Sequence, residues 1–153
     1  MNFNDFKEVI EFAIGKEKEA IVFYEEVGSQ EAFSGGRDVF RKFAEEERKH
    51  QALLEGFLSG ERPVDGYKFK WIPDMKRSDY LVDLTYEKNM AYADMLRLAM
   101  KREEKALALY RHLEKETDKE DLRNIFKMLR QEEAKHKLAL ETLYDDYMAE
   151  MGD

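Results

Sequence analysis

Apolar residues recur at intervals of three and four along most of the chain, which is the spacing that places side chains on one face of an α-helix. These stretches are rich in Ala, Leu, Glu and Lys, which favour helices, and contain no proline. The expected helices cover residues 4–29, residues 37–58, a third stretch that begins between 78 and 84 and ends near 115, and residues 118–148. The pattern therefore predicts an all-α protein, a bundle of four helices.

A connection that contains proline separates the first two helices from the last two. Both prolines and the single tryptophan lie in SGERPVDGYKFKWIPDMKRS, residues 59–78. Proline has no backbone N–H and does not continue a helix, so we expect a long crossover here. The crossover divides the chain into a first helical hairpin, about residues 4–58, and a second, about residues 79–148. A chain of 153 residues suffices for one hydrophobic core, so we expect a single domain over residues 1–153.

The two hairpins repeat each other at a constant separation. AIGKEKEAIVFYEEV, which begins at Ala13, aligns with AMKREEKALALYRHL, which begins at Ala99. FRKFAEEERKHQALL, which begins at Phe40, aligns with FKMLRQEEAKHKLAL, which begins at Phe126. Both alignments have the same offset of 86 residues. The shared offset indicates that one helical hairpin has been used twice.

One glutamate interrupts the apolar stripe of each expected helix, and in two helices a histidine follows it by three positions. A carboxylate at a core position is costly unless its charge is compensated. Two divalent cations would neutralise four carboxylates, and oxygen ligands with one imidazole per ion suit iron or manganese, with zinc as an alternative. The sequence thus predicts a two-metal site with the candidate ligands Glu17, Glu47, His50, Glu103, Glu133 and His136.

Two tyrosines lie two helical turns beyond a candidate ligand on the same face of their helices. Tyr24 follows Glu17 at this spacing, and Tyr110 follows Glu103. They are either core aromatics at helical spacing or groups whose phenols donate to a ligand carboxylate and orient it. The third histidine, His112, points away from this face, and we expect it on the surface.

Charge and composition exclude several classes of function. The formal net charge of −8 disfavours binding to nucleic acid or to anionic lipid, which both attract basic surfaces. The sequence contains no cysteine, which excludes disulfides, thiolate metal sites and iron–sulfur centres within it. It has no signal-peptide pattern and no apolar run of the ~20 residues that a membrane span needs. We therefore expect a cytoplasmic protein without nucleic-acid or membrane partners.

The segments EKEAIVFY, EEKALALY, EERKH and EEAKH resemble the helix motifs of the rubrerythrin branch of the ferritin-like superfamily, and the resemblance covers nearly the whole chain. It implies a ferritin-like four-helix bundle, a homodimer, and a di-iron centre held by the six candidate ligands. Rubrerythrins reduce peroxide with electrons from a rubredoxin centre. This sequence lacks the rubredoxin cysteines, and Ala106 stands where rubrerythrins proper carry an extra carboxylate.

These observations favour a di-iron carboxylate oxidoreductase with two iron ions that reduces peroxide or dioxygen. Its electrons would come from an external electron-donor protein. One alternative is an iron-handling or metal-buffering protein with incidental ferroxidase chemistry. Another is an interaction bundle with a vestigial site. Spacing alone does not decide which glutamates bridge the two ions.

Overall fold

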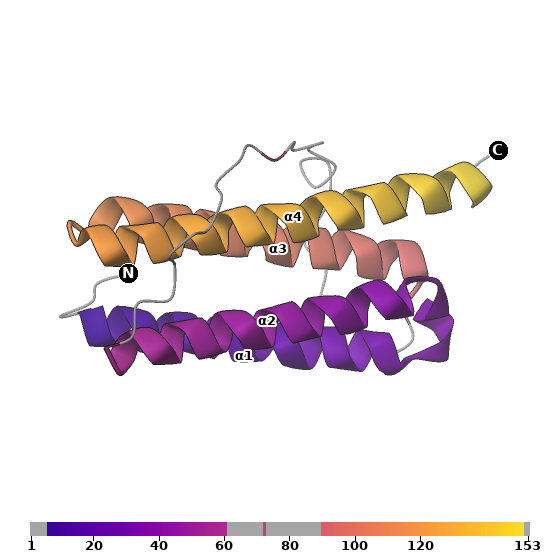
Figure 1. The fold of residues 1–153 in the computed structure, drawn as a ribbon. Helices are drawn as coiled ribbons and strands as arrows, with labels where there is room; N and C mark the ends of the chain where they lie inside the picture. The colour runs from indigo at the N-terminus through magenta and orange to yellow at the C-terminus, as the bar shows by residue number, and fades with distance from the viewer. Residues whose placement is uncertain (1–5, 61–71, 73–89, 152–153) are drawn as a thin grey trace. The chain divides into compact units, whose positions relative to one another are not determined.

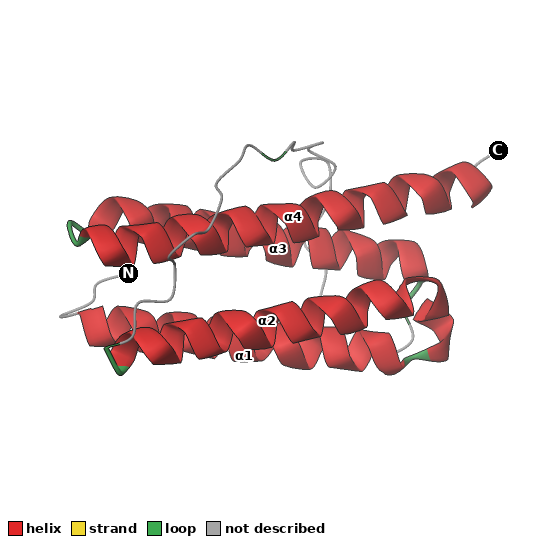
Figure 2. Ribbon diagram, viewed as in Figure 1, coloured by secondary structure: helices red, strands yellow, loops and turns green. Residues whose placement is uncertain are grey.

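The computed structural model describes residues 6–60, 72 and 90–151 (Figure 1). All regular secondary structure in these residues is helical (Figure 2). The elements are α1 (Phe6–Ser29), the 3-10 helix η1 (Glu31–Gly36), α2 (Arg37–Leu58), α3 (Tyr92–Glu116) and α4 (Glu120–Met151). Contacts between Cα atoms divide the chain into two compact units. The first contains α1, η1, α2 and the beginning of α4, and the second contains α3 and α4 from Phe126 onward.

In the first unit, α1 and α2 form a hairpin that packs through its apolar stripes. Phe40 and Leu54 of α2, and Ile10 and Val27 of α1, are fully buried. The short helix η1 turns the chain between α1 and α2. It ends at Gly36, directly before α2 begins at Arg37, so the first two α-helices are separated where the sequence predicted, between residues 29 and 37.

In the second unit, α3 and α4 contact each other through aromatic and charged side chains. Tyr92 lies edge-on to Tyr147 with 4.9 Å between the ring centroids. The Arg97 guanidinium donates to the Tyr144 hydroxyl at 2.9 Å and 3.2 Å, and Arg97 also pairs with Asp94. These contacts lie near the first turns of α3 and the last turns of α4, so the two helices run antiparallel.

The internal repeat is visible in equivalent ring contacts of the two hairpins. Tyr24 stacks on Phe40 with 6.4 Å between centroids and 15° between the rings. Tyr110 stacks on Phe126 with 6.2 Å and 22°. Because each pair joins the two helices of its own hairpin, the two hairpins align their helices in the same register.

Most predicted helix boundaries agree with the structure. The second helix has the predicted limits Arg37–Leu58. The third described helix begins at Tyr92, after non-helical Met90 and Ala91, so it is not continuous with any helix that precedes Met90. The predicted start between 78 and 84 lies outside the described residues. The Ala91 carbonyl accepts the first helical hydrogen bond, but alanine has no side-chain cap that would have indicated this start. Residues 61–71 and 73–89, which contain most of the predicted crossover, lie outside the described residues.

The fourth helix begins at Glu120 and ends at Met151, which is slightly later at both ends than predicted. The Thr117 side chain accepts a hydrogen bond from the Lys119 N–H at 3.3 Å, and the Thr117 carbonyl accepts one from Arg123. Thr117 therefore orders the turn that precedes the helix. Among the residues that the structure describes, no helix combines the length and the apolar character needed to cross a membrane.

Candidate metal centre

The first unit contains a buried cluster of two glutamates and one histidine. Glu17 comes from α1, while Glu47 and His50 come from the same face of α2, one turn apart. Their exposed fractions are 2%, 1% and 4%. The Nδ1 atom of His50 lies 3.6 Å from Oε2 of Glu17 and 3.3 Å from Oε1 of Glu47.

The second unit contains the equivalent cluster. Glu103 comes from α3, while Glu133 and His136 come from α4, and each is 2% exposed. The Nδ1 atom of His136 lies 3.6 Å from Oε1 of Glu103 and 3.9 Å from Oε1 of Glu133. In both hairpins the same imidazole nitrogen therefore faces both carboxylates.

The distances within each cluster suit a shared metal ion. Two ligand atoms that each lie about 2.1 Å from one ion are at most about 4.2 Å apart. The nitrogen–oxygen distances of 3.3–3.9 Å fall within this limit. Two carboxylates match the charge of one divalent cation, and oxygen donors with one imidazole suit iron or manganese, while zinc also accepts them. Each cluster therefore fits one divalent ion.

The electrostatics of the first cluster also favour a bound cation. Burial, followed by the neighbouring Glu47 carboxylate, raises the pKa of the Glu17 carboxyl from its ordinary value of 4.5 to about 8. The hydrogen bond and the charge of His50 act in the opposite direction. Glu17 is therefore protonated at neutral pH when no cation is bound, and a metal ion that binds there releases this proton.

The two tyrosines predicted beside the ligands are buried core residues. Tyr24 and Tyr110 are each 1% exposed. Besides its stacking on Phe40, Tyr24 lies edge-on to Phe43 with 5.2 Å between centroids. These ring contacts are what a core aromatic makes, and the role of the phenols in orienting a ligand stays a prediction. His112 is exposed on α3, as the sequence predicted.

Periodicity did not single out two further charged residues that are buried on α4. Lys137, which directly follows His136, is 3% exposed, and Glu141 is fully buried. Both lie beside the apolar stripe and not within it, so the sequence pattern alone places them with the solvated residues. Their equivalents in the first hairpin are the half-buried Gln51 and the exposed Glu55.

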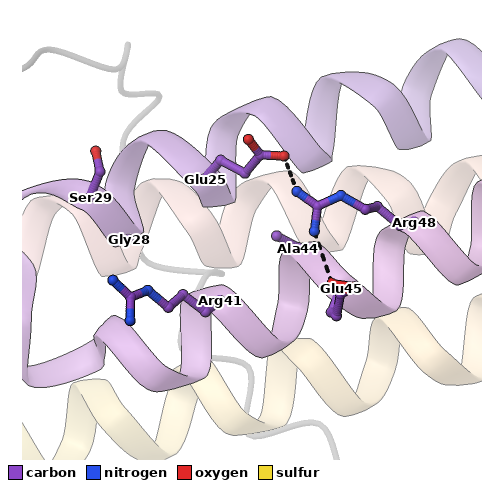
Figure 3. A pocket seen from close by; sticks show the side chains of 7 residues that line it. All are labelled: Glu25, Gly28, Ser29, Arg41, Ala44, Glu45 and Arg48. Atoms are coloured by element: carbon purple, nitrogen blue, oxygen red, sulfur yellow. Dashed lines mark hydrogen bonds and ion pairs between the residues drawn. The ribbon is translucent and has the colours of Figure 1, made fainter.

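A cleft of about 350 Å³ on the first hairpin lies apart from the candidate ligands (Figure 3). Arg48 lines it and pairs with both Glu25 and Glu45. Gly28 and Ala44 also line it, and their repeat equivalents in the second hairpin are Glu114 and Arg130, which form an ion pair at 3.3 Å. The cleft therefore exists because small residues replace a pair of long ones, and it contributes none of the six candidate ligands.

Comparison with known proteins identifies relatives over nearly the whole chain. A family model described as Rubrerythrin matches residues 8–144. The chain is similar to a solved structure described as a hypothetical protein from Pyrococcus furiosus, with 28% sequence identity and a TM-score of 0.67. The match covers 93% of this chain and 89% of the other. No curated protein matches the sequence significantly. The solved structure confirms the predicted fold class, an all-α bundle of four helices.

Proposed function

The chain belongs to the rubrerythrin family, and from this premise we propose that it is a di-iron oxidoreductase. It would reduce hydrogen peroxide or dioxygen with electrons from an external donor protein. The observation that carries the proposal is the presence of one buried Glu–Glu–His cluster in each hairpin, with matching nitrogen–oxygen distances. The family and these clusters fit a di-iron protein.

Each cluster would hold one iron ion. A pair of Fe(II) ions held by these residues would supply two electrons, which with two protons convert one molecule of hydrogen peroxide into two of water. Four glutamates match the charge of two Fe(II) ions, so the loaded site is close to neutral before the reaction. A di-iron centre requires the two clusters to share their pair of ions, which is part of the proposal.

Side chains of the two hairpins favour the binding of metal ions at this site. The Nδ1 atoms of His50 and His136 face carboxylate oxygens, so each imidazole would offer this nitrogen to an ion that the carboxylates of its own cluster hold. Burial of the carboxylates keeps bulk water away and strengthens their attraction for a cation. The stacked Tyr24 and Tyr110 rings lie on the same helix faces as Glu17 and Glu103 and fix the packing there.

We propose that the electrons enter from another molecule, since the given sequence has no cysteine with which to form a rubredoxin-type centre. A small redox protein is the donor that we propose. The alternative of an iron-handling protein differs in a measurable way: it predicts reversible iron exchange and slow oxidation of the bound iron.

The test is rapid mixing of the anaerobic Fe(II) protein with hydrogen peroxide. We expect two iron ions per chain and oxidation within seconds. A His136→Ala variant should bind less iron and react slowly, while His112→Ala, which removes an exposed histidine, should behave like the wild type. An iron–iron distance of about 3.5–4 Å from X-ray absorption would support a shared pair. Two ions that are bound but oxidised only over minutes would favour iron handling instead.

A further inference from the structure

The two hairpins differ in charge directly beside the proposed ligands. Residues four positions apart are neighbours on a helix surface. The second helix of each hairpin carries three residues at this spacing, and the first of the three is the ligand glutamate. They are Glu47, Gln51 and Glu55 on α2, and Glu133, Lys137 and Glu141 on α4. The neighbour of the ligand is thus a neutral amide in the first hairpin and a lysine in the second.

The difference in charge has a larger electrostatic effect because Lys137 is buried. In the first hairpin Glu55 is exposed, and Gln51 is half-buried and donates to it at 2.6 Å. In the second hairpin Lys137 is 3% exposed and Glu141 is fully buried. Water screens charges at the surface of α2, whereas a charge that is buried on α4 acts over a longer range.

Helix geometry favours a lysine side chain that extends toward the ligand. In an α-helix the Cα–Cβ bonds tilt toward the N-terminus, so a side chain covers the turn that precedes it. Lys137 therefore leans over the turn of α4 that carries Glu133. The Glu141 side chain leans in turn toward Lys137, and its negative charge offsets part of the effect.

We propose that the two metal positions are inequivalent and that Lys137 sets the difference between them. The positive charge of Lys137 opposes a divalent cation on the second hairpin, while the equivalent position in the first hairpin carries the neutral amide of Gln51. The second position therefore binds its ion more weakly, by about tenfold for a buried charge that Glu141 partly compensates. This inference rests on the proposed function only in requiring one ion per hairpin.

The experiment is an anaerobic titration of the full chain with Co(II), which reports each binding step by its absorption. The wild type should bind two ions in two steps separated by about tenfold in affinity. Lys137→Gln, which installs the residue of the first hairpin, should tighten the weaker step and bring the two steps together. Gln51→Lys, the reverse exchange, should weaken the tighter step, by a smaller factor because position 51 is half-buried.

Three control variants test whether Lys137 causes the difference in affinity and which hairpin holds each ion. Lys135→Gln removes the same charge from α4, but Lys135 is 41% exposed and pairs with Glu132, so both steps should stay unchanged. His136→Ala should abolish the weaker step, and His50→Ala the tighter one. Equal affinities in the wild type would overturn the inference, as would a Lys137→Gln variant whose two steps stay as far apart as before. A protein that binds no Co(II) would instead contradict the proposed function.

Discussion

Replacement of Glu17 by Gln should stabilise the metal-free protein, although it removes a proposed ligand. Glu17 is 2% exposed, and its pKa is raised from 4.5 to about 8. At pH 7 the unfolded chain carries an ionised Glu17 and the folded chain a protonated one, so folding must take up a proton. A pH of 7 lies 2.5 units above the ordinary glutamate pKa of 4.5, which applies to the unfolded chain. At about 1.4 kcal/mol per unit, the proton uptake costs about 3 kcal/mol of folding free energy. Glutamine resembles the protonated carboxyl and avoids this cost.

The raised pKa of Glu17 also determines how the stability difference between the wild type and Glu17→Gln changes with pH. Below pH 4.5 both the folded and the unfolded state hold the proton, and the wild type and Glu17→Gln should be similarly stable. Between pH 4.5 and about 8 the unfolded state loses its proton first, so the wild type loses stability relative to the variant as the pH rises. Above pH 8 both states are ionised, and the difference stays constant.

The assay is urea unfolding in the presence of EDTA at pH 5, 7 and 8.5, followed by circular dichroism. The free energy of unfolding of Glu17→Gln minus that of the wild type should be under about 1 kcal/mol at pH 5 and about 3 kcal/mol at pH 7. Glu26→Gln, which changes an exposed glutamate on the same helix, should show no such trend. A Glu17→Gln variant that is less stable than the wild type at pH 7 without metal would refute the reasoning.

Two further predictions concern metal removal and the core. Removal of iron from the loaded protein with EDTA at pH 7.5 should lower the melting temperature by about 10–20 °C, because each of the two ions, at a free concentration of 100 times its Kd, contributes about 2.7 kcal/mol. A Glu47→Gln/Glu133→Gln double variant should not respond to EDTA, and a wild type that is equally insensitive would contradict a metal-stabilised fold. Phe40→Ala should destabilise the protein by about 3–5 kcal/mol in urea unfolding, since Phe40 is fully buried against Tyr24. A loss below about 1 kcal/mol would show that this ring does not support the first hairpin.

The helices and the candidate ligands could be predicted because each leaves a periodic signal in the sequence. A lone glutamate within an apolar stripe faces the core and not the solvent, so it indicates a buried site. The internal repeat gives this signal twice, at Glu47 and at Glu133. The start of α3 at Tyr92 left no such signal, because Ala91 has no capping side chain. The burial of Lys137 and Glu141 was also missed. Periodicity identifies the stripe that faces the hairpin partner, whereas burial of a second face depends on tertiary packing.

The repeated hairpin gives this protein an internal reference for spectroscopy. Because the ring pairs Tyr24–Phe40 and Tyr110–Phe126 are stacked alike in the two hairpins, a substitution at one pair leaves an equivalent, unaltered pair in the same molecule. A change that a probe detects in one half can then be compared with the other half at identical concentration, temperature and buffer. Differences that are too small to establish between two separate samples become measurable within one.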